Sequence, residues 1–360
     1  MRTILILLFA SITACSDTDK PTKVDSLVVG MDLSFQPQIA DEGFVYRNAS
    51  GESVEMLPFL SAKGVDIIRL RLWHSPTNGY SGLDEVLEYA LKVKAVGMDI
   101  LLDIHYSDTW ADPETQTPPS AWNDLNFEEI KTEINSYTTY VLTALADQNT
   151  PPTIVQIGNE INQGFLWNTG RVGGEFENNW GNFRALLNEG IKAVRSVDAS
   201  VKIMLHYAGV DGVNWFFAGV DELDFDIIGL SYYPIWHKVS LPALGQTLDF
   251  MAESYDRPIM IVETAYPFTL EWNDWTNNNW GEAGQLLSGY PATSEGQKQF
   301  FTDLKNIVAD IPDDKGLGVC WWAPDWVAYR GKEATNGSTW ENAAIFDFEG
   351  KALPIVDELN

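Results

Sequence analysis

The chain has 360 residues, of which 45% are hydrophobic and 21% are charged, so it is long enough for one large domain or two ordinary ones. Its 51 acidic residues outnumber 23 basic residues and give a formal charge of −28. Such a surface repels phosphate backbones, and no basic stripe offsets it, so the composition argues against a nucleic-acid-binding protein. A neutral partner would not be affected by this field.

The first residues are predicted to be a targeting segment. One arginine precedes an apolar run of eleven residues, Ile4 to Ala14, which is too short to span a bilayer and fits the core of a signal peptide. The run ends in Ile-Thr-Ala before Cys15, which resembles a bacterial lipobox, in which the cysteine becomes the lipidated N-terminus of the mature protein. An ordinary secretory signal is the alternative. We therefore expect a lipid anchor in the bacterial cell envelope, at the outer membrane surface or the periplasmic face.

These features divide the chain into a signal peptide (1–14), a lipidated cysteine with a polar tether (15–26) and a single folded domain (27–360). Cys320 is the second of the two cysteines and lies in the apolar stretch "GLGVCWW". If Cys15 is lipidated, no disulfide is available, and Cys320 is predicted to be a small buried hydrophobic side chain.

Eight apolar, strand-like runs follow one another through the rest of the chain. Helix-like stretches separate many of them, at 83–97, 126–148, 179–198 and 294–311, the last with a Ser-x-x-Gln start at Ser294 and Gln297. Strands that alternate with helices pair in parallel, so we predict a single α/β TIM barrel, (β/α)8. A doubly wound open sheet is the alternative, but no glycine-rich phosphate loop follows the first strand. The runs begin at Leu27, Asp66, Asp99, Thr153, Val201, Phe225, Pro258 and Gly316.

The polar residues of these runs gather at their C-terminal ends, which is where barrel enzymes place their active sites. The longest segments without periodicity, 108–123, 162–179 and 268–293, also follow strands and would lie on the same face. The strand-end residues, in chain order, are Asp32, Arg69, Arg71, Asp103, His105, Asn159, Glu160, His206, Tyr207, Tyr232, Tyr233, Glu263, Trp321 and Trp322.

Two of these residues, Glu160 and Glu263, are acids that buried strands carry to the rim of the barrel. They end the fourth and seventh runs, "TIVQIGNE" and "PIMIVE", so we expect their side chains to converge across the mouth of the barrel. An unpaired buried carboxylate costs several kcal/mol, so each acid needs either a partner or a chemical role. Two facing carboxyl groups suit glycoside hydrolysis, in which one donates a proton to the leaving oxygen and the other attacks the anomeric carbon.

Other residues could support such a pair. Arg71 could be the cation beside Glu263, but Arg69 lies on the same strand face and the sequence does not choose between them. Large aromatics stack on sugar rings, and 14 Trp and 13 Tyr are available. Long loops also carry tryptophans at 110, 122, 272, 275 and 280. We predict substrate contacts from Arg71, Asp103, His105, Asn159, Tyr232 (also as a hydrogen-bond donor to Glu263), Trp110 and Trp322.

A metal centre is not predicted. The chain has only four histidines and no His-x-x-x-His pattern, which argues against catalytic zinc. The oxygen-rich run that contains Asp274, Asn277 and Asn279 could hold calcium, but it lacks the Asp-x-Asp-x-Asp-Gly spacing of a defined loop. We interpret it as a solvated turn and expect that no cofactor is required.

Several sequence blocks, taken in order, resemble glycoside hydrolase family 53, the endo-β-1,4-galactanases. They are "GMDLSF", "IIRLRLW", "DIHYSDTWADP", "PPSAW", "VQIGNEINQG", "GLSYYPIWH", "VETAYP" and "WWAPDWVA". The resemblance implies a clan A barrel and a retaining double displacement on the β-1,4-galactan side chains of pectin. It implies Glu160 as the acid/base and Glu263 as the nucleophile. It also implies a structural calcium after strand seven in many bacterial members, although their Asp-Gly-Asp-Gly-His-like pattern is not found here.

Two other functions remain open at this point. Another clan A endo-glycosidase, of the mannanase or cellulase type, would use the same two acids with different walls around the sugar. A surface glycan-binding lipoprotein without turnover would keep the cleft, but it would have no need for two converging acids. We expect a monomer that binds β-1,4-galactan, does not bind nucleic acid, and meets the membrane only through its lipid anchor.

Overall fold

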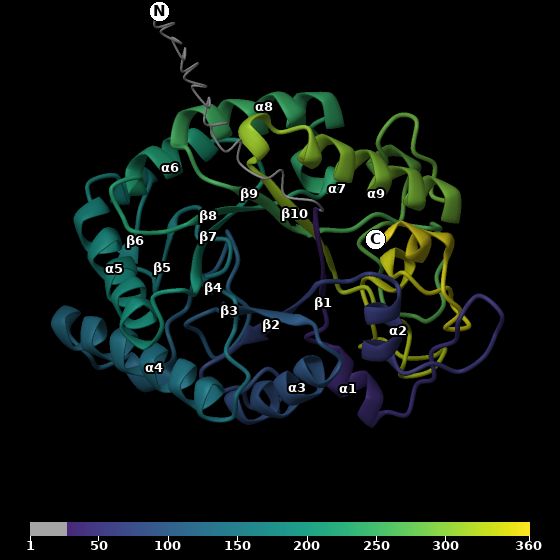
Figure 1. Cartoon of the computed structure of the whole chain (residues 1–360), viewed down its shortest axis with the longest axis horizontal. Helices are drawn as coiled ribbons and strands as arrows, with labels where there is room; N and C mark the ends of the chain where they lie inside the picture. Colours follow the sequence, from purple (N-terminus) through teal and green to yellow (C-terminus); the bar gives the residue numbers. More distant parts are fainter. Residues whose placement is uncertain (1–26) are drawn as a thin grey trace, which may run out of the picture.

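Eight parallel strands close into a barrel in the computed structural model, which describes residues 27–360 (Figure 1). Each predicted run forms one strand, and the open-sheet alternative is wrong because the first strand pairs with the last. The order around the barrel is β1-β10-β9-β8-β7-β4-β3-β2. The strands are β1 (Val28–Asp32), β2 (Ile67–Leu72), β3 (Asp99–Ile104), β4 (Ile154–Ile157), β7 (Lys202–Ala208), β8 (Ile227–Ser231), β9 (Ile259–Thr264) and β10 (Gly316–Trp322).

Helices surround the barrel, and the four predicted helical stretches are confirmed as α3, α4, α5 and α9 (Figure 1). Helix α9 begins at Ser294 as predicted, but its N-cap is Thr293 and not Ser294, because the Thr293 hydroxyl accepts a hydrogen bond from the backbone N–H of Gly296 (3.0 Å). The helices are α1 (Gln36–Asp41), α2 (Met56–Ala62), α3 (Leu83–Ala95), α4 (Phe127–Asp147), α5 (Trp180–Val197), α6 (Val213–Val220), α7 (Pro234–His237), α8 (Leu241–Tyr255) and α9 (Ser294–Ala309).

Alternate residues of each strand fill the inside of the barrel, so its lower part is apolar and its upper part is polar. The apolar layer consists of Ile67, Leu101, Ile154, Met204, Ile227, Met260, Val262 and Cys320. Two residues further along β2 and β3 the same face carries Arg69 and Asp103. Cys320 is buried and free, as predicted. The barrel interior therefore changes from a packed core to a charged floor within one side-chain layer.

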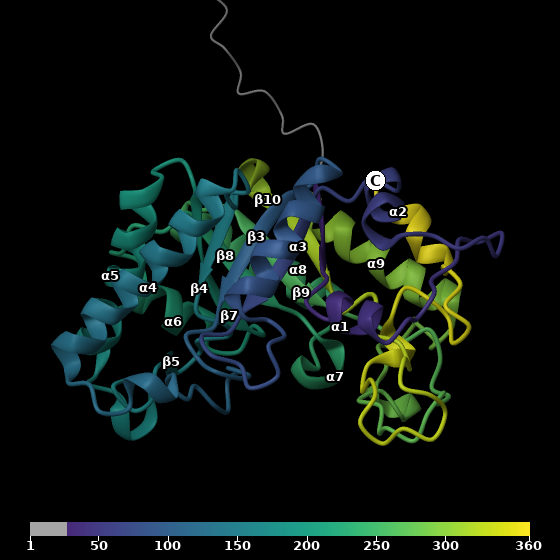
Figure 2. The same ribbon diagram turned by 90° about the horizontal axis from the view of Figure 1, so that it is seen from below.

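The loops that follow the strands lie together at one end of the barrel (Figure 2). The loop after β4 contains a short hairpin of β5 (Gly164–Phe165) and β6 (Gly170–Arg171). The loop after β9 (265–293) and the segment after β10 (323–345) are joined by backbone hydrogen bonds, including Phe268 N–H to Asn342 O (2.9 Å). These long segments build the walls above the charged floor.

The predicted signal peptide and the lipidated Cys15 lie outside the described residues. Within residues 27–360, none of the helices combines the length and the apolar composition that crossing a bilayer requires.

Candidate active site

A cleft of about 660 Å³ opens at the loop end of the barrel and contains both predicted acids. Most strands of the barrel contribute to its floor or walls, as expected for a barrel enzyme. Its lining residues are Asp32, Arg69, Arg71, His105, Trp110, Ala111, Asp112, Pro113, Glu114, Asn159, Glu160, Ala208, Tyr233, Trp236, His237, Glu263, Trp322, Trp326, Thr339 and Trp340.

Glu263 reaches this cleft because of a register shift in β9. Ile261 pairs with Leu230 of β8, and the next paired residue is Glu263, so one residue of β9 is skipped. Val262 belongs to the apolar layer inside the barrel, and strict alternation would then point Glu263 away from the interior. The shift turns the Glu263 carboxyl group into the mouth of the barrel, as β-bulges beside active sites do.

Two fixed donors hold the Glu263 carboxylate, which is only 5% exposed. Its Oε1 lies 2.8 Å from Nη2 of Arg69, and its Oε2 accepts a hydrogen bond from the Tyr233 hydroxyl (2.8 Å). Burial raises the pKa of Glu263 to about 7, whereas Arg69 lowers it and the Tyr233 hydrogen bond does the same. The two donors therefore offset part of the effect of burial and favour the ionised form of Glu263.

Arg69 is the cation beside Glu263, which answers the choice that the sequence left open. It also pairs with Asp32 (2.6 Å) and Asp103 (2.9 Å), and all of these side chains are buried. Burial opposes its charge, but Asp103, Glu263 and Asp32 raise its pKa well above the ordinary value. Arg69 thus links β1, β2, β3 and β9 beneath the cleft.

Arg71 lies in the cleft wall and not against Glu263. Its guanidinium carbon is 4.8 Å from the ring centre of Phe35, 4.5 Å from that of Trp73 and 4.1 Å from that of Trp110. Nη2 also donates to Ser81 Oγ at 3.0 Å. Burial lowers the pKa of Arg71 to about 10. Arg71 lines the cleft, and its contact with a substrate stays a prediction.

Glu160 lies beyond the end of β4, on a tight turn. The backbone of Gly158 has φ of 77° and that of Glu160 has φ of 46°, a left-handed conformation that is uncommon for a non-glycine residue. Glu160 Oε1 accepts a hydrogen bond from Ser231 Oγ (2.6 Å). Burial in the cleft raises the pKa of Glu160 to about 8, and the neighbouring Glu263 carboxylate raises it as well. Glu160 is therefore the carboxyl group of the pair that keeps its proton longer.

Asn159 lies beside Glu160, with its amide fixed by the protein. Nδ2 donates to the carbonyl of Ala111 (2.8 Å), and Oδ1 accepts from Arg69 Nη2 (2.9 Å). His105 also lines the cleft, and its Nε2 lies 2.9 Å from Asp103 Oδ2. Both residues are where the sequence placed them, at the rim of the floor.

Two predicted substrate contacts need correction. The Tyr232 hydroxyl donates to the carbonyl of Val239, and the residue is fully buried outside the cleft. Its neighbour Tyr233 makes the expected contact with Glu263 instead. Asp103 is also fully buried, and it reaches the cleft only through Arg69 and His105. Asp103 therefore supports the site from behind the residues that line it.

Sequence reasoning gave no role to three residues that surround the two acids. Tyr233 contacts Glu263, and Ser231 and His206 lie beside Glu160. The first and last were noted only as strand-end residues, and Ser231 was not noted at all. Because the last residues of adjacent parallel strands meet at one edge, the position of Ser231 at the end of β8 was the signal that could have identified it.

Tryptophans form much of the cleft wall, and Trp110 and Trp322 are among them as predicted. Trp322 packs edge-on against Trp340, with ring centres 4.8 Å apart. Two other loop tryptophans, Trp122 and Trp280, are buried and hold their loops in place. An exposed indole face beside fixed polar groups is suited to stacking against a sugar ring.

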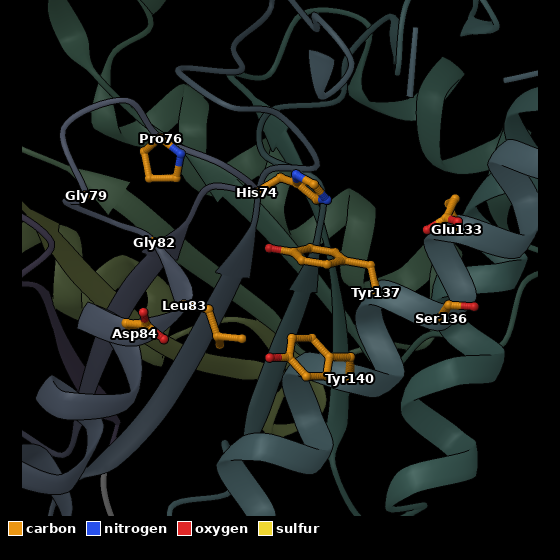
Figure 3. Close-up of a pocket in the computed structure, with 10 residues that line it drawn as sticks. All are labelled: His74, Pro76, Gly79, Gly82, Leu83, Asp84, Glu133, Ser136, Tyr137 and Tyr140. Atoms are coloured by element: carbon orange, nitrogen blue, oxygen red, sulfur yellow. The ribbon is translucent and has the colours of Figure 1, made fainter. Parts of the chain in front are cut away.

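A second hollow of about 610 Å³ lies on the outer surface between α3 and α4 (Figure 3). Tyr137 and Tyr140 of α4 face the start of α3 across it, and the Tyr137 ring lies against His74, with ring centres 4.7 Å apart. It contains neither Glu160 nor Glu263. The hollow at the mouth of the barrel is therefore the candidate active site.

The oxygen-rich run after β9 is only in part a solvated turn. Asn277 is exposed, but Asp274 is 4% exposed and packs against the segment after β10. Among the described residues, four buried side-chain oxygens of this region have no hydrogen-bond partner: Asp274 Oδ2, Asn278 Oδ1, Glu341 Oε2 and Asn342 Oδ1. No group of three or more His, Cys, Asp or Glu within residues 27–360 is arranged to hold a metal ion, so a cation here would depend on amide oxygens as well.

Comparisons with known proteins agree with this geometry. Residues 28–359 match the profile described as glycosyl hydrolase family 53. The chain is 38% identical to the arabinogalactan endo-β-1,4-galactanase of Cellvibrio japonicus, over 91% of this chain and 88% of that protein. It is 31% identical to the endo-β-1,4-galactanase of Bacillus subtilis, over 91% and 84% of the two chains. The family 53 catalytic domain of Ignisphaera aggregans superimposes with a TM-score of 0.87 at 35% identity, over 94% and 97% of the two chains.

Proposed function

Because this chain belongs to glycosyl hydrolase family 53, we propose that it is a retaining endo-β-1,4-galactanase that hydrolyses the (arabino)galactan side chains of pectin. The observation that carries the proposal is the pair of carboxyl groups in one cleft with opposite surroundings. Glu263 is held by a cation and a hydroxyl, and Glu160 by a single neutral donor. A double displacement requires one ionised and one protonated carboxyl group.

In the first step, an ionised Glu263 oxygen attacks the anomeric carbon while Glu160 gives its proton to the departing glycosidic oxygen. Arg69 and Tyr233 keep the Glu263 carboxylate charged and oriented for this attack. In the second step, Glu160, now ionised, removes a proton from water. The water attacks the galactosyl–Glu263 ester and regenerates both carboxyl groups.

The walls of the cleft support a neutral polysaccharide as substrate. Trp110, Trp236, Trp322 and Trp340 offer ring faces or edges, and Arg71 and Asn159 offer fixed donors to hydroxyl groups. The formal charge of −28 would repel the anionic backbone of pectin but not its neutral galactan side chains.

The test is the release of reducing ends from linear β-1,4-galactan by the protein without residues 1–15, beside Glu263→Ala. Rapid release by the parent and a loss of several orders of magnitude in the variant are expected. Faster cleavage of β-mannan or a soluble cellulose would favour another clan A specificity. Binding of galactan without cleavage would favour the glycan-binding lipoprotein and overturn the catalytic proposal.

We also propose that Cys15 carries a lipid that anchors a monomeric enzyme in the cell envelope. The support is the short apolar run and the lipobox-like ending before Cys15. When the full chain is expressed in a bacterial host, the parent should fractionate with membranes and Cys15→Ser should not. Equal fractionation of the two would contradict the anchor, and light scattering on the truncated protein would test the monomer.

A structural calcium is proposed for the region where the loop after β9 meets the segment after β10. The residues that would hold it are Asp274, Asn278 and Glu341, in place of the predicted Asn277 and Asn279. Their unpaired oxygens are the hard ligands that calcium prefers, and a bound cation would offset the burial of two carboxylates. Burial raises the pKa of Glu341, and the Asp274 carboxylate adds to this, so the two groups lie close enough to interact.

The calcium proposal is tested by thermal unfolding in millimolar calcium and in a chelator. The parent should lose about 2–5 °C of unfolding temperature in the chelator, Asp274→Ala should no longer respond, and the exposed Asn277→Ala should respond like the parent. An unfolding temperature of the parent that is independent of calcium would contradict the site.

A further inference from the structure

Three side chains from adjacent strands form a hydrogen-bonded chain that ends on the proposed acid/base. Ser231, at the end of β8, lies 2.6 Å from Glu160 Oε1 through its hydroxyl oxygen. Nε2 of His206, on β7, lies 2.9 Å from the same hydroxyl. Both Ser231 and His206 are fully buried. The hydrogen-bonded chain therefore runs from the barrel interior, where Ser231 and His206 are shielded from solvent, to the Glu160 carboxyl group in the cleft.

The surroundings of His206 decide which ring nitrogen carries the proton. Nδ1 faces two donors, the backbone N–H of Glu160 (3.3 Å) and the side-chain amide of Gln156 (3.1 Å). One acceptor, Asn159 Oδ1, also lies 3.0 Å away, but this oxygen already accepts from Arg69. The Gln156 amide also lies within reach of Asp103 Oδ1 and the Gly158 carbonyl, but the backbone N–H of Glu160 can only donate. Nδ1 must therefore be unprotonated to accept from it, so the proton lies on Nε2. Burial and the nearby Arg69 hold the pKa of His206 well below its usual range, so the ring is neutral.

This tautomer fixes the direction of the serine hydroxyl. Nε2–H donates to Ser231 Oγ, so the single proton of the hydroxyl is left to point at Glu160 Oε1. In the other tautomer, Ser231 would donate to the ring and could only accept from Glu160. The neutral histidine thus selects the serine as a donor.

We infer that His206 is a positioning residue that acts through Ser231: it makes the serine a fixed donor to Oε1 of Glu160, so that the catalytic proton is carried by Oε2. The inference rests on the proposed acid/base role of Glu160. No proton passes along the chain. The proton on Oε2 goes to the glycosidic oxygen, and the protons of Ser231 and His206 stay in place.

The hydrogen bond from Ser231 also lowers the pKa of Glu160, against the groups that raise it. Burial and the carboxylates of Glu263 and Asp112 raise the pKa of Glu160, whereas the Ser231 hydrogen bond and Arg69 lower it. On the far side, Arg69, Asp103 and His105 face His206. Because Glu160 must be protonated in the first step and ionised in the second, a donor to Oε1 keeps its pKa low enough for both steps.

The test compares Ser231→Ala, His206→Asn and His206→Gln with the parent. Glutamine can place an N–H near the position of Nε2, whereas the shorter asparagine cannot. The high-pH limb of kcat/KM on galactan should move up by about 0.5–1 pH unit in Ser231→Ala and His206→Asn. In His206→Gln the limb should stay where the parent has it. Circular dichroism and thermal unfolding identify a variant that has not folded, and Ser231→Ala alone still decides the question if His206→Asn fails to fold.

A second measurement separates this inference from the acid/base role itself. Glu160→Ala should lose galactan cleavage but keep a rapid first step, seen as a burst of dinitrophenol, on a dinitrophenyl β-galactobioside, whose leaving group needs no proton. If it loses nothing on galactan, the acid/base assignment fails. If Glu160→Ala behaves as expected but Ser231→Ala and His206→Asn keep the parent's pH profile, the positioning role of His206 is overturned and the assignment of Glu160 survives.

Discussion

Glu160 and Glu263 are the same side chain at the same end of one barrel, and burial raises the pKa of both, but their hydrogen-bond partners differ. Glu263 lies within a strand, where a buried cation and a tyrosine hydroxyl hold its two oxygens. Glu160 lies beyond its strand, on a strained turn, and a neutral serine holds one oxygen. The difference shows that the fold assigns the chemical role of an acid through its donors, and not through its depth alone.

The comparison also explains the backbone irregularities of the two positions. A register shift in β9 brings Glu263 into contact with Arg69, and positive φ angles at Gly158 and Glu160 bring the other acid over Ser231. A regular strand would place neither carboxyl group correctly. Both departures occur at the mouth of the barrel, where they position side chains for catalysis.

The largest expected effect comes from removing each acid in turn. Glu263→Ala should reduce kcat on galactan by about five orders of magnitude, and a good leaving group should not restore it, because the nucleophile is absent. Glu160→Ala should lose about three orders of magnitude on galactan but little of the first step on the dinitrophenyl substrate. Steady-state and burst kinetics check this. Identical responses of the two variants to leaving-group quality would remove the distinction between the two acids.

Removing the cation should affect stability as well as activity. Arg69→Met leaves Asp32, Asp103 and Glu263 without their shared partner, so we expect a loss of about 3–5 kcal/mol in the free energy of unfolding. The control is Arg71→Met, which loses ring contacts but leaves no buried carboxylate unpaired and should cost about 1–2 kcal/mol. Urea unfolding measures both values. Equal costs would mean that the carboxylates find other partners.

A smaller effect is expected from Tyr233→Phe, which removes one of the two donors to Glu263. The hydrogen bond from Tyr233 lowers the pKa of Glu263, so its loss should move the low-pH limb of kcat/KM upward, by about half a pH unit. In the parent, activity should fall below about pH 7 as Glu263 gains a proton and above about pH 8 as Glu160 loses one. Tyr232→Phe is the matched control, because its hydroxyl lies outside the cleft. A low-pH limb that moves in both variants, or in neither, would contradict the role of Tyr233.

The fold and the location of the two acids could be predicted from the sequence. The eight apolar runs each became a strand, and the order of strands placed Glu160 and Glu263 at the same end of the barrel. Buried strands are recognisable because their composition is apolar on both faces, and the C-terminal end of a parallel strand has a fixed location. The family blocks then gave the two acids their expected roles.

The partners of the two acids could not be predicted in the same way. Arg69 and Arg71 share a strand face, and only coordinates reveal that the aromatic rings of Phe35, Trp73 and Trp110 surround the second one. Tyr232 and Tyr233 are adjacent, so a local shift in register decides which of them reaches Glu263. The first choice depends on how distant aromatic residues pack around the strand, and the second depends on a one-residue change in register. Sequence patterns are insensitive to both.

The smallest expected effect is on the free energy of unfolding. The raised pKa of Glu160 suits its proposed role as an acid, but it makes the folded state less stable as the pH rises. The pKa of Glu160 is raised from its ordinary 4.5 to about 8, so between these values the folded state binds more protons than the unfolded state. Stability contributed by this group is therefore present at low pH and is lost as the pH rises from about 4.5 to 8. Glu160→Gln, which cannot ionise, should escape this loss and be more stable than the parent by about 1–2 kcal/mol at pH 8, with little difference at pH 4.5.

Urea unfolding at the two pH values measures this difference, and Glu114→Gln on the same cleft wall is the control. The gain should be smaller for Glu263→Gln, because that substitution removes a carboxylate that Arg69 and Tyr233 stabilise, and it leaves the buried Arg69 with one partner fewer. If Glu263→Gln were instead more stabilising than Glu160→Gln, the carboxylate of Glu263 would destabilise the folded state more than that of Glu160. The contrast between a supported nucleophile and a weakly supported acid would then be wrong.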